Sequence, residues 1–128
     1  MAKKRTRRPT EAELEILCVL WARRSATVRE VHEELARGKP TGYTTTLKLM
    51  QIMLDKGLVQ RDESRRSHVY RPALSQAAAQ RMMLRTLRDR VFGGSAGRLV
   101  VQALRAGQVS LEELAEIRRL LDDLREQP

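Results

Sequence analysis

Apolar residues recur at helical spacing in three segments of the N-terminal half of the chain. The segments cover residues 10–23, 27–37 and 43–56, and each predicts an amphipathic helix with one buried face. The residues expected in the buried faces of the first two helices are Leu14, Leu17, Cys18 and Trp21, and then Val28, Val31 and Leu35. Gly57 follows the third segment, at a position where glycine commonly ends a helix.

Polar start signals support these boundaries. A Ser or Thr followed three residues later by Glu can form a capping box, and this pattern occurs at Thr10–Glu13, Thr27–Glu30 and Ser110–Glu113. The stretch GKPTG, residues 38–42, is rich in helix breakers and separates the second and third predicted helices. These two helices therefore form a candidate helix-turn-helix pair.

Two short segments after Gly57 have the character of strands. LVQRDE and HVYRP, joined by SRRS at residues 64–67, predict an antiparallel hairpin in which Pro72 ends the second strand. Three helices followed by a hairpin is the order of a winged helix-turn-helix domain, with the hairpin as its wing. We therefore expect a mostly α fold with a small β-hairpin, in which residues 10–73 form the winged domain.

The C-terminal part, residues 74–128, predicts three further helices. They are separated by GGSAG at residues 93–97 and by Gly107. Apolar residues of the last helix repeat like the a and d positions of two facing helices. Three helices in about 55 residues bury too little for a core of their own, so we expect a dimerisation domain. Folding back onto the winged domain is the alternative. The predicted dimer interface comprises Met83, Leu87, Val91, Leu99, Leu114, Ile117, Leu121 and Leu124.

The net charge of +9 is concentrated at the N-terminus. The first eight residues carry +5, whereas residues 9–72 and 73–128 carry +2 each. Positive charge of this kind suits phosphate, so residues 1–9 are predicted to be a flexible basic arm.

Other function classes find little support. No apolar run is long enough for a transmembrane helix, and no apolar segment of a secretory signal follows the basic start. Cys18, the only cysteine, excludes an internal disulfide, fits a reducing cytoplasm, and is expected to be buried. The only histidines are His32 and His68, without a zinc-binding spacing or a catalytic motif. We therefore expect no enzyme activity, no metal and no cofactor.

The segment YTTTLKLMQIMLDK, residues 43–56, has two different faces. Its polar face carries Thr44, Lys48, Gln51 and Asp55. Thr46 lies in the middle of the opposite, buried arc, while Thr45 and Ile52 lie at the boundary. We expect the Thr46 hydroxyl to donate to the carbonyl four residues earlier.

The polar face suits the major groove of DNA, because hydroxyls, amides and a lysine can bind base edges. Arg65 and Arg66 at the hairpin turn suit phosphates or the adjacent minor groove. We therefore expect double-stranded DNA as a partner. Two alternatives stay open: a winged-helix module that docks protein through Ile52 and Leu54, and a winged-helix regulator with a small-molecule inducer.

Five segments resemble the penicillinase repressor family across nearly the whole chain: PTEAELEILCVLW, TVREVHEEL, YTTTLKLMQIMLDKGLV, VYRPALS and VFGGSAGRLVVQAL. The resemblance implies a dimeric winged-helix repressor that binds a palindromic operator and controls β-lactamase and related genes in an antibiotic response. The DNA contacts that it implies are Tyr43, Thr44, Thr45, Lys48, Gln51, Arg65 and Arg66.

The chain departs from the family pattern at three places. Many relatives carry arginine where this chain has Ile52, which changes the expected operator contacts. Some members are induced by cleavage of an Asn-Phe bond, which aligns with Gln102 and Ala103 here, and a membrane sensor-protease is then a further partner. Copper-responsive relatives carry paired cysteines near the C-terminus, which this chain lacks.

Overall fold

The structure is a computed structural model that describes residues 8–127. Apart from Arg8 and Pro9, the predicted basic arm of residues 1–9 lies outside the described residues. The chain divides into two compact units, Met1–Leu84 and Arg85–Pro128. The division falls inside helix α4 (Gln76–Arg90).

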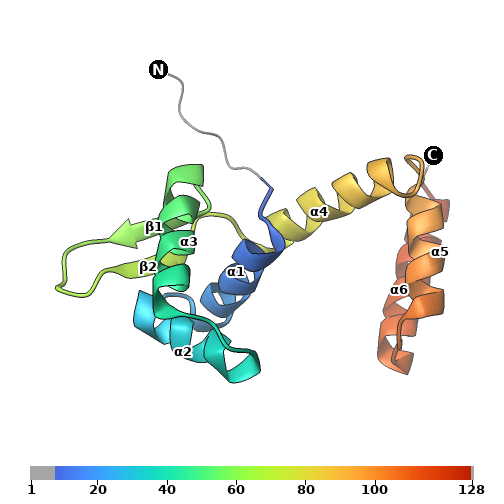
Figure 1. Ribbon diagram of the computed structural model, residues 1–128. Coiled ribbons are helices and arrows are strands. Elements are labelled where there is room, and N and C mark those ends of the chain that lie inside the picture. The colour runs from blue at the N-terminus through green and yellow to red at the C-terminus, as the bar shows by residue number, and fades with distance from the viewer. Residues whose placement is uncertain (1–7, 128) are drawn as a thin grey trace, which may run out of the picture. The chain divides into compact units, whose positions relative to one another are not determined.

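The first unit contains three helices, a hairpin and the start of α4 (Figure 1). The bounds are α1 Glu11–Arg23, α2 Val28–Gly38, α3 Tyr43–Lys56, β1 Val59–Asp62 and β2 Val69–Pro72. Each element lies within two residues of its predicted range, and the winged-helix fold predicted from the sequence is confirmed.

Local signals explain where the helices begin and end. In α1 the backbone N–H of Glu13 donates to Thr10 Oγ1 (3.2 Å), and the Thr10 N–H donates to Glu13 Oε1 (2.9 Å), which completes the capping box. α2 begins with the same reciprocal pair at Thr27 and Glu30. α3 ends at Gly57, whose φ of 82° lies in the left-handed region that favours glycine.

The two strands pair antiparallel, with Val59 opposite Pro72 and Asp62 opposite Val69. A third segment joins them through Ala26, between α1 and α2. The Ala26 N–H donates to the Tyr70 carbonyl (2.9 Å), and the Tyr70 N–H donates to the Ala26 carbonyl (2.8 Å). This bridge was not predicted, because a single pairing residue leaves no strand pattern in the sequence.

The core of the first unit is aliphatic, as expected, with one buried aromatic ring. Helices α1, α2 and α3 and the hairpin all contribute to it. Its members are Ile16, Leu17, Val19, Leu20, Ala26, Val28, Val31, Met50, Met53, Leu58, Val59 and Tyr70. Trp21 packs at the edge, where its indole N–H donates to the Leu74 carbonyl (3.1 Å).

The prediction that Cys18 is buried was wrong, because the buried face of α1 lies elsewhere. Cys18 is exposed, and the stripe buried at i, i+3, i+4 and i+7 begins at Glu13. A glutamate fits this face because Lys56 Nζ, at the end of α3, donates to both of its oxygens (2.9 and 2.8 Å). Burial raises the pKa of Glu13, but the hydrogen bonds from Lys56 and Thr10 outweigh it, so that this pKa lies below its ordinary value.

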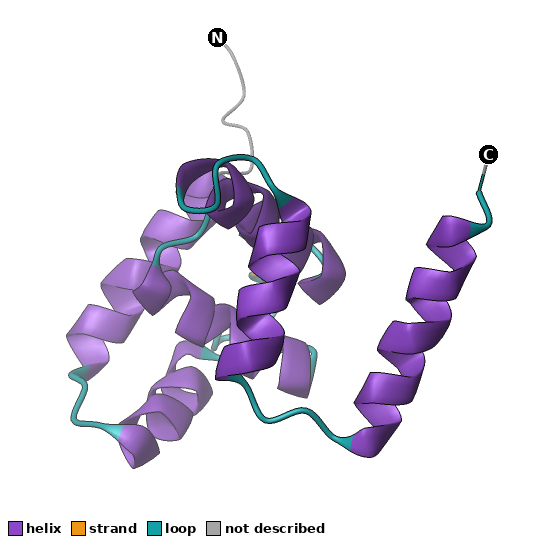
Figure 2. Cartoon of the chain, turned by 90° about the vertical axis from the view of Figure 1, so that its right-hand side faces the viewer, coloured by secondary structure: helices purple, strands orange, loops and turns teal. Residues whose placement is uncertain are grey.

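The second unit contains the end of α4, then α5 (Ala96–Ala106) and α6 (Leu111–Arg125). Ser95 and Ser110 cap the last two helices, the second in a capping box. Figure 2 shows α6, which leads to the C-terminus, standing clear of α5. Among residues 85–127 no side chain is buried. This unit therefore has helices with well-formed ends but no core of its own.

Within residues 8–127, no helix combines the length and the apolar character that crossing a lipid bilayer requires.

Candidate nucleic-acid interface

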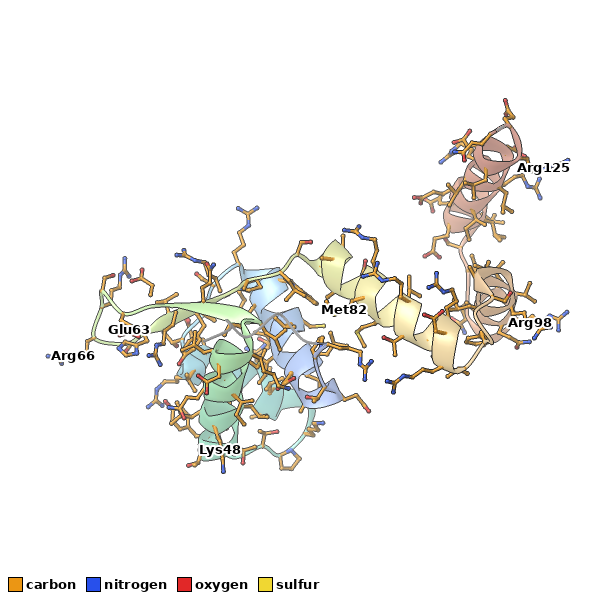
Figure 3. All side chains as sticks on the ribbon, turned by 90° about the horizontal axis from the view of Figure 1, so that it is seen from above. Lys48, Glu63, Arg66, Met82, Arg98 and Arg125 are labelled. Carbon is orange, nitrogen blue, oxygen red and sulfur yellow. The ribbon has the colours of Figure 1, made fainter. Side chains whose placement is uncertain are left out.

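Helix α3 presents two faces of opposite character. Thr46, Met50 and Met53 are completely buried. The predicted contacts on the other side, Thr44, Thr45, Lys48 and Gln51, are all exposed. Figure 3 shows Lys48 pointing away from the body of the first unit. The buried face fixes the helix, so the exposed side chains project from a rigid support.

The three consecutive threonines of α3 differ as the helical wheel predicted. Thr46 is buried, and its hydroxyl lies 3.4 Å from the Gly42 carbonyl, to which it donates. Thr44 and Thr45 are exposed in the first turn of the helix. Only these two hydroxyls are therefore available to an external partner.

The start of α3 differs from the starts of α1, α2 and α6. Those three begin with capping boxes, whereas Gly42 precedes α3 and supplies no side-chain cap. The first N–H groups of an uncapped helix lack an acceptor and lie at the positive end of the helix dipole. This end of α3 is therefore suited to an anionic group.

Two side chains of α2 hold Tyr43, the first residue of α3. The His32 ring meets the Tyr43 ring edge-on, with centroids 5.7 Å apart and an interplanar angle of 80°. The guanidinium carbon of Arg29 lies 5.8 Å from the centroid of the same ring, within cation–π range. Although Tyr43 is 41% exposed, its ring therefore has contacts that orient it.

Short-range contacts shape the hairpin that forms the wing. Asp62 Oδ1 accepts from the Ser64 N–H (2.9 Å), and this bond, with the positive charges of Arg71 and Arg65, lowers the pKa of Asp62. Arg61 donates to Glu63 through Nε (2.8 Å) and to the Tyr70 hydroxyl (3.4 Å).

Arg65 and Arg66 are exposed at the turn, and Figure 3 shows Arg66 at the tip of the hairpin.

A groove of about 450 Å³ brings α3 and the wing together. We call it the wing groove; it is lined by Thr27, Val28, Arg29, Tyr43, Leu47, Gln51, Arg61, Arg66, Ser67, His68 and Tyr70. Three of the seven predicted DNA contacts, Tyr43, Gln51 and Arg66, line it. These three residues, from α3 and the wing, therefore lie around one groove of the first unit.

The residues predicted for a dimer interface lie in α4, α5 and α6, except Val91, which directly follows α4. Ile117, Leu99 and Met83 are half-buried. The other members are more exposed: Leu87 43%, Val91 64%, Leu114 44%, Leu121 51% and Leu124 53%. A large part of the apolar surface of α6 thus faces no other part of the described second unit.

The predicted cleavage bond between Gln102 and Ala103 lies inside α5, and both residues are exposed. The Ala103 carbonyl accepts from the Gly107 N–H (3.0 Å), which closes the last turn of the helix. Within residues 8–127, no three His, Cys, Asp or Glu side chains form a group that could hold a metal ion.

Arg29 was not among the DNA contacts predicted from the sequence. It lies in the first turn of α2, two residues after the Thr27 cap. A usable signal existed, because the first helix of a helix-turn-helix pair crosses the DNA backbone. An arginine at its start was therefore a candidate phosphate contact.

Comparison with known proteins gives a consistent picture. A family model described as penicillinase repressor matches residues 9–123. The penicillinase repressor of Bacillus licheniformis is 25% identical over 114 residues, which cover 89% of each chain. That of Staphylococcus aureus is 20% identical over 113 residues, covering 88% of this chain and 90% of the relative.

Two solved structures resemble the first unit. The solution structure of the DNA-binding domain of the repressor BlaI has a TM-score of 0.52 and 26% identity, covering 58% of this chain and 90% of that one. The B. licheniformis BlaI monomeric form in complex with the blaP half-operator has a TM-score of 0.50 and 25% identity, covering 56% and 88%.

Proposed function

The chain belongs to the penicillinase repressor family, and from this premise we propose how it acts as a DNA-binding transcriptional repressor. Two copies bind a palindromic operator, each placing α3 in the major groove and its wing, residues 62–69, on the neighbouring backbone. The family consists of transcriptional repressors, so the chain is not an enzyme, as predicted.

The observation that carries this proposal is the division of α3 into a buried and an exposed face. Thr44, Lys48 and Gln51 project from a helix whose opposite side is locked into the core. Side chains that read bases need such a support, because discrimination depends on accurately placed hydrogen bonds. The similarity to a BlaI structure solved with a half-operator supports DNA as the partner of the first unit.

In this proposal the seven contacts divide by chemistry. Thr44, Thr45 and Gln51 bind base edges, and Lys48 binds guanine or phosphate. Tyr43 borders the uncapped start of α3, and Arg65 and Arg66 bind phosphates or the minor groove from the wing. The exposed apolar side chains of the second unit support dimerisation, because a second copy would remove them from water.

We place this activity in the cytoplasm, where a bacterial repressor meets its DNA. Relief of repression through a membrane sensor-protease and cleavage between Gln102 and Ala103 stays a prediction. Because proteases bind extended backbone, cleavage within α5 requires the end of this helix to unwind first. The test is a digest of the full chain with the sensor-protease. Cleavage in the loops before and after α5 that leaves the bond between Gln102 and Ala103 intact would contradict this prediction.

The alternatives are less well supported. A module that docks protein through α3 needs an apolar exposed face, but Ile52, at 39% exposure, is flanked by polar side chains. The core of the first unit is filled by its own aliphatic side chains and gives no support to a small-molecule inducer.

The direct test is selection of binding sites from fragmented genomic DNA with the purified full chain. We expect enriched fragments that share an inverted repeat, and tighter binding to the selected duplex than to a scrambled duplex of equal composition. Fluorescence anisotropy at fixed salt measures the ratio. Equal affinity for both duplexes would contradict sequence-specific repression.

A further inference from the structure

The wing groove has a marked charge. Among its lining residues are three arginines, Arg29, Arg61 and Arg66, together with His68, and no aspartate or glutamate lines it. Polar groups such as the Thr27 and Ser67 side chains complete the lining. A groove with this composition is complementary to an anion.

The three arginines are not equivalent. Arg61 is paired with Glu63, which offsets its charge. By contrast, neither Arg29 nor Arg66 forms an ion pair within residues 8–127 of the structure. Both residues are exposed and can therefore bind an external phosphate.

Arg29 is also oriented in advance. Its guanidinium packs over the Tyr43 ring at 5.8 Å, while His32 contacts that ring edge-on. An arginine held against an aromatic ring loses less conformational freedom when it binds a phosphate. Tyr43 thus serves as a platform that connects the start of α2 to the start of α3.

The position of the groove indicates which anion fits it. When a recognition helix lies in the major groove and the wing lies on the adjacent minor groove, one DNA strand passes between them. The wing groove lies between α3 and the hairpin, so this strand must follow it.

We propose that Arg29 binds a phosphate of the strand between α3 and the wing, and that Tyr43 is its positioning residue. This inference rests on the proposed function, because it takes double-stranded DNA as the partner. Arg29 fixes the register of α3 on the duplex and contributes equally on all sequences.

The first test compares Arg29→Gln with Arg37→Gln in the full chain. Arg37 lies on the same helix, but in the last turn and with a 77% exposed side chain. A lost phosphate contact should reduce the slope of log affinity against log salt by about 0.9 per bound copy. We expect this for Arg29→Gln and an unchanged slope for Arg37→Gln and for Arg29→Lys, which keeps the charge.

A second measurement identifies the phosphate. In the selected duplex, neutral methylphosphonates replace single phosphates of the strand expected in the wing groove. One position should weaken binding of the natural chain and have no effect on Arg29→Gln. If every position weakens both proteins equally, Arg29 has no phosphate of its own and the inference is overturned.

The role of Tyr43 is tested by a double-mutant cycle. Tyr43→Leu should weaken binding by about 2- to 5-fold more in the natural chain than in the Arg29→Gln background, and this difference is the size of an exposed cation–π contact. Tyr43→Phe, which keeps the ring, should retain the coupling between residue 43 and Arg29. Additive losses would overturn the positioning role.

The two proposals fail in different ways. If the natural chain prefers its selected duplex but Arg29→Gln keeps the full salt slope, the inference is overturned and the repressor function stands. If the natural chain shows no sequence preference, the proposed function itself is overturned.

Discussion

The two units of the chain are both largely helical, yet only the first contains a core. Residues 8–84 bury aliphatic side chains from three helices and a hairpin, together with the Tyr70 ring. Residues 85–127 bury no side chain, although α5 and α6 are regular and capped. The capping box of α6 has the same geometry as those of α1 and α2. Local signals therefore decide where a helix begins, but packing decides whether it is stable.

This difference gives the two units different sources of stability. The first unit is stabilised by contacts within one chain, so its free energy of unfolding should not depend on protein concentration. Under the proposed dimerisation, the helices of the second unit are stabilised by another copy, and their stability should rise with concentration. Five predictions test or sharpen this contrast, from the largest expected effect to the smallest.

The largest effect should come from the core of the first unit. Met50→Ala removes a completely buried side chain and should lower the free energy of unfolding by about 2–5 kcal/mol. Urea titrations at two protein concentrations, followed by circular dichroism, measure the loss. A midpoint for the first unit that shifts with protein concentration would contradict its independence.

The buried ion pair should come next. Lys56→Met leaves the Glu13 carboxylate buried without its partner and should cost about 3 kcal/mol at pH 7. Lys39→Met is the matched control. It removes the exposed partner of Glu15, which lies on α1 like Glu13, and should cost less than about 1 kcal/mol. Equal losses in the two variants, measured by urea titration, would contradict a special role for Glu13.

The same pair predicts a pH dependence. Because the pKa of Glu13 in the folded chain lies below its ordinary value of about 4.5, its contribution is fully present above that pH and is lost as the pH falls through the lower pKa. In Lys56→Met the buried Glu13 carboxylate has no partner, so protonation removes the free-energy cost of burying its charge. The stability difference between the two proteins should therefore shrink below about pH 4.5.

A smaller effect should follow from Leu121→Ala in α6. The side chain is 51% exposed in one copy, so burial against a second copy should contribute about 2 kcal/mol per copy. Analytical ultracentrifugation should show weaker dimerisation, while the first unit unfolds as before. A purely monomeric natural chain of 14.7 kDa at micromolar concentration would contradict dimerisation itself.

The smallest effect should be on DNA recognition. Thr44→Ala or Gln51→Ala should weaken binding to the selected duplex by about 1 kcal/mol, the lower end for one base contact, and leave binding to scrambled DNA nearly unchanged. Thr46→Val is the control, because its side chain faces the core. Anisotropy titrations that show selective loss with Thr46→Val would contradict the assignment of the two faces.

Most of the fold could be predicted because its signals are local. Capping boxes, the apolar spacing and Gly57 fix the helices of the first unit within a residue or two. The face of α1 could not be predicted, because Glu13 belongs to it only through Lys56, 43 residues later. The bridge between Ala26 and Tyr70 is equally non-local.

The candidate site shows the same limit. The wheel of α3 correctly separated Thr46 from Thr44, because the period of one helix is sufficient for that distinction. The position of Arg29 at the start of α2 was visible in the sequence, but its contact with Tyr43 and its place in the groove depend on α2, α3 and the hairpin together. The DNA contacts and the dimer interface remain predictions until they are tested.

The separation of the three threonines has a consequence for how such a repressor can diverge. Thr44 and Thr45 can be replaced without disturbing the core, whereas Thr46 is tied to Gly42 and to its buried neighbours. Mutations can therefore accumulate on the outer side of α3 at little cost to folding. After gene duplication, a copy could acquire a new operator by changes at a few codons while keeping the same scaffold.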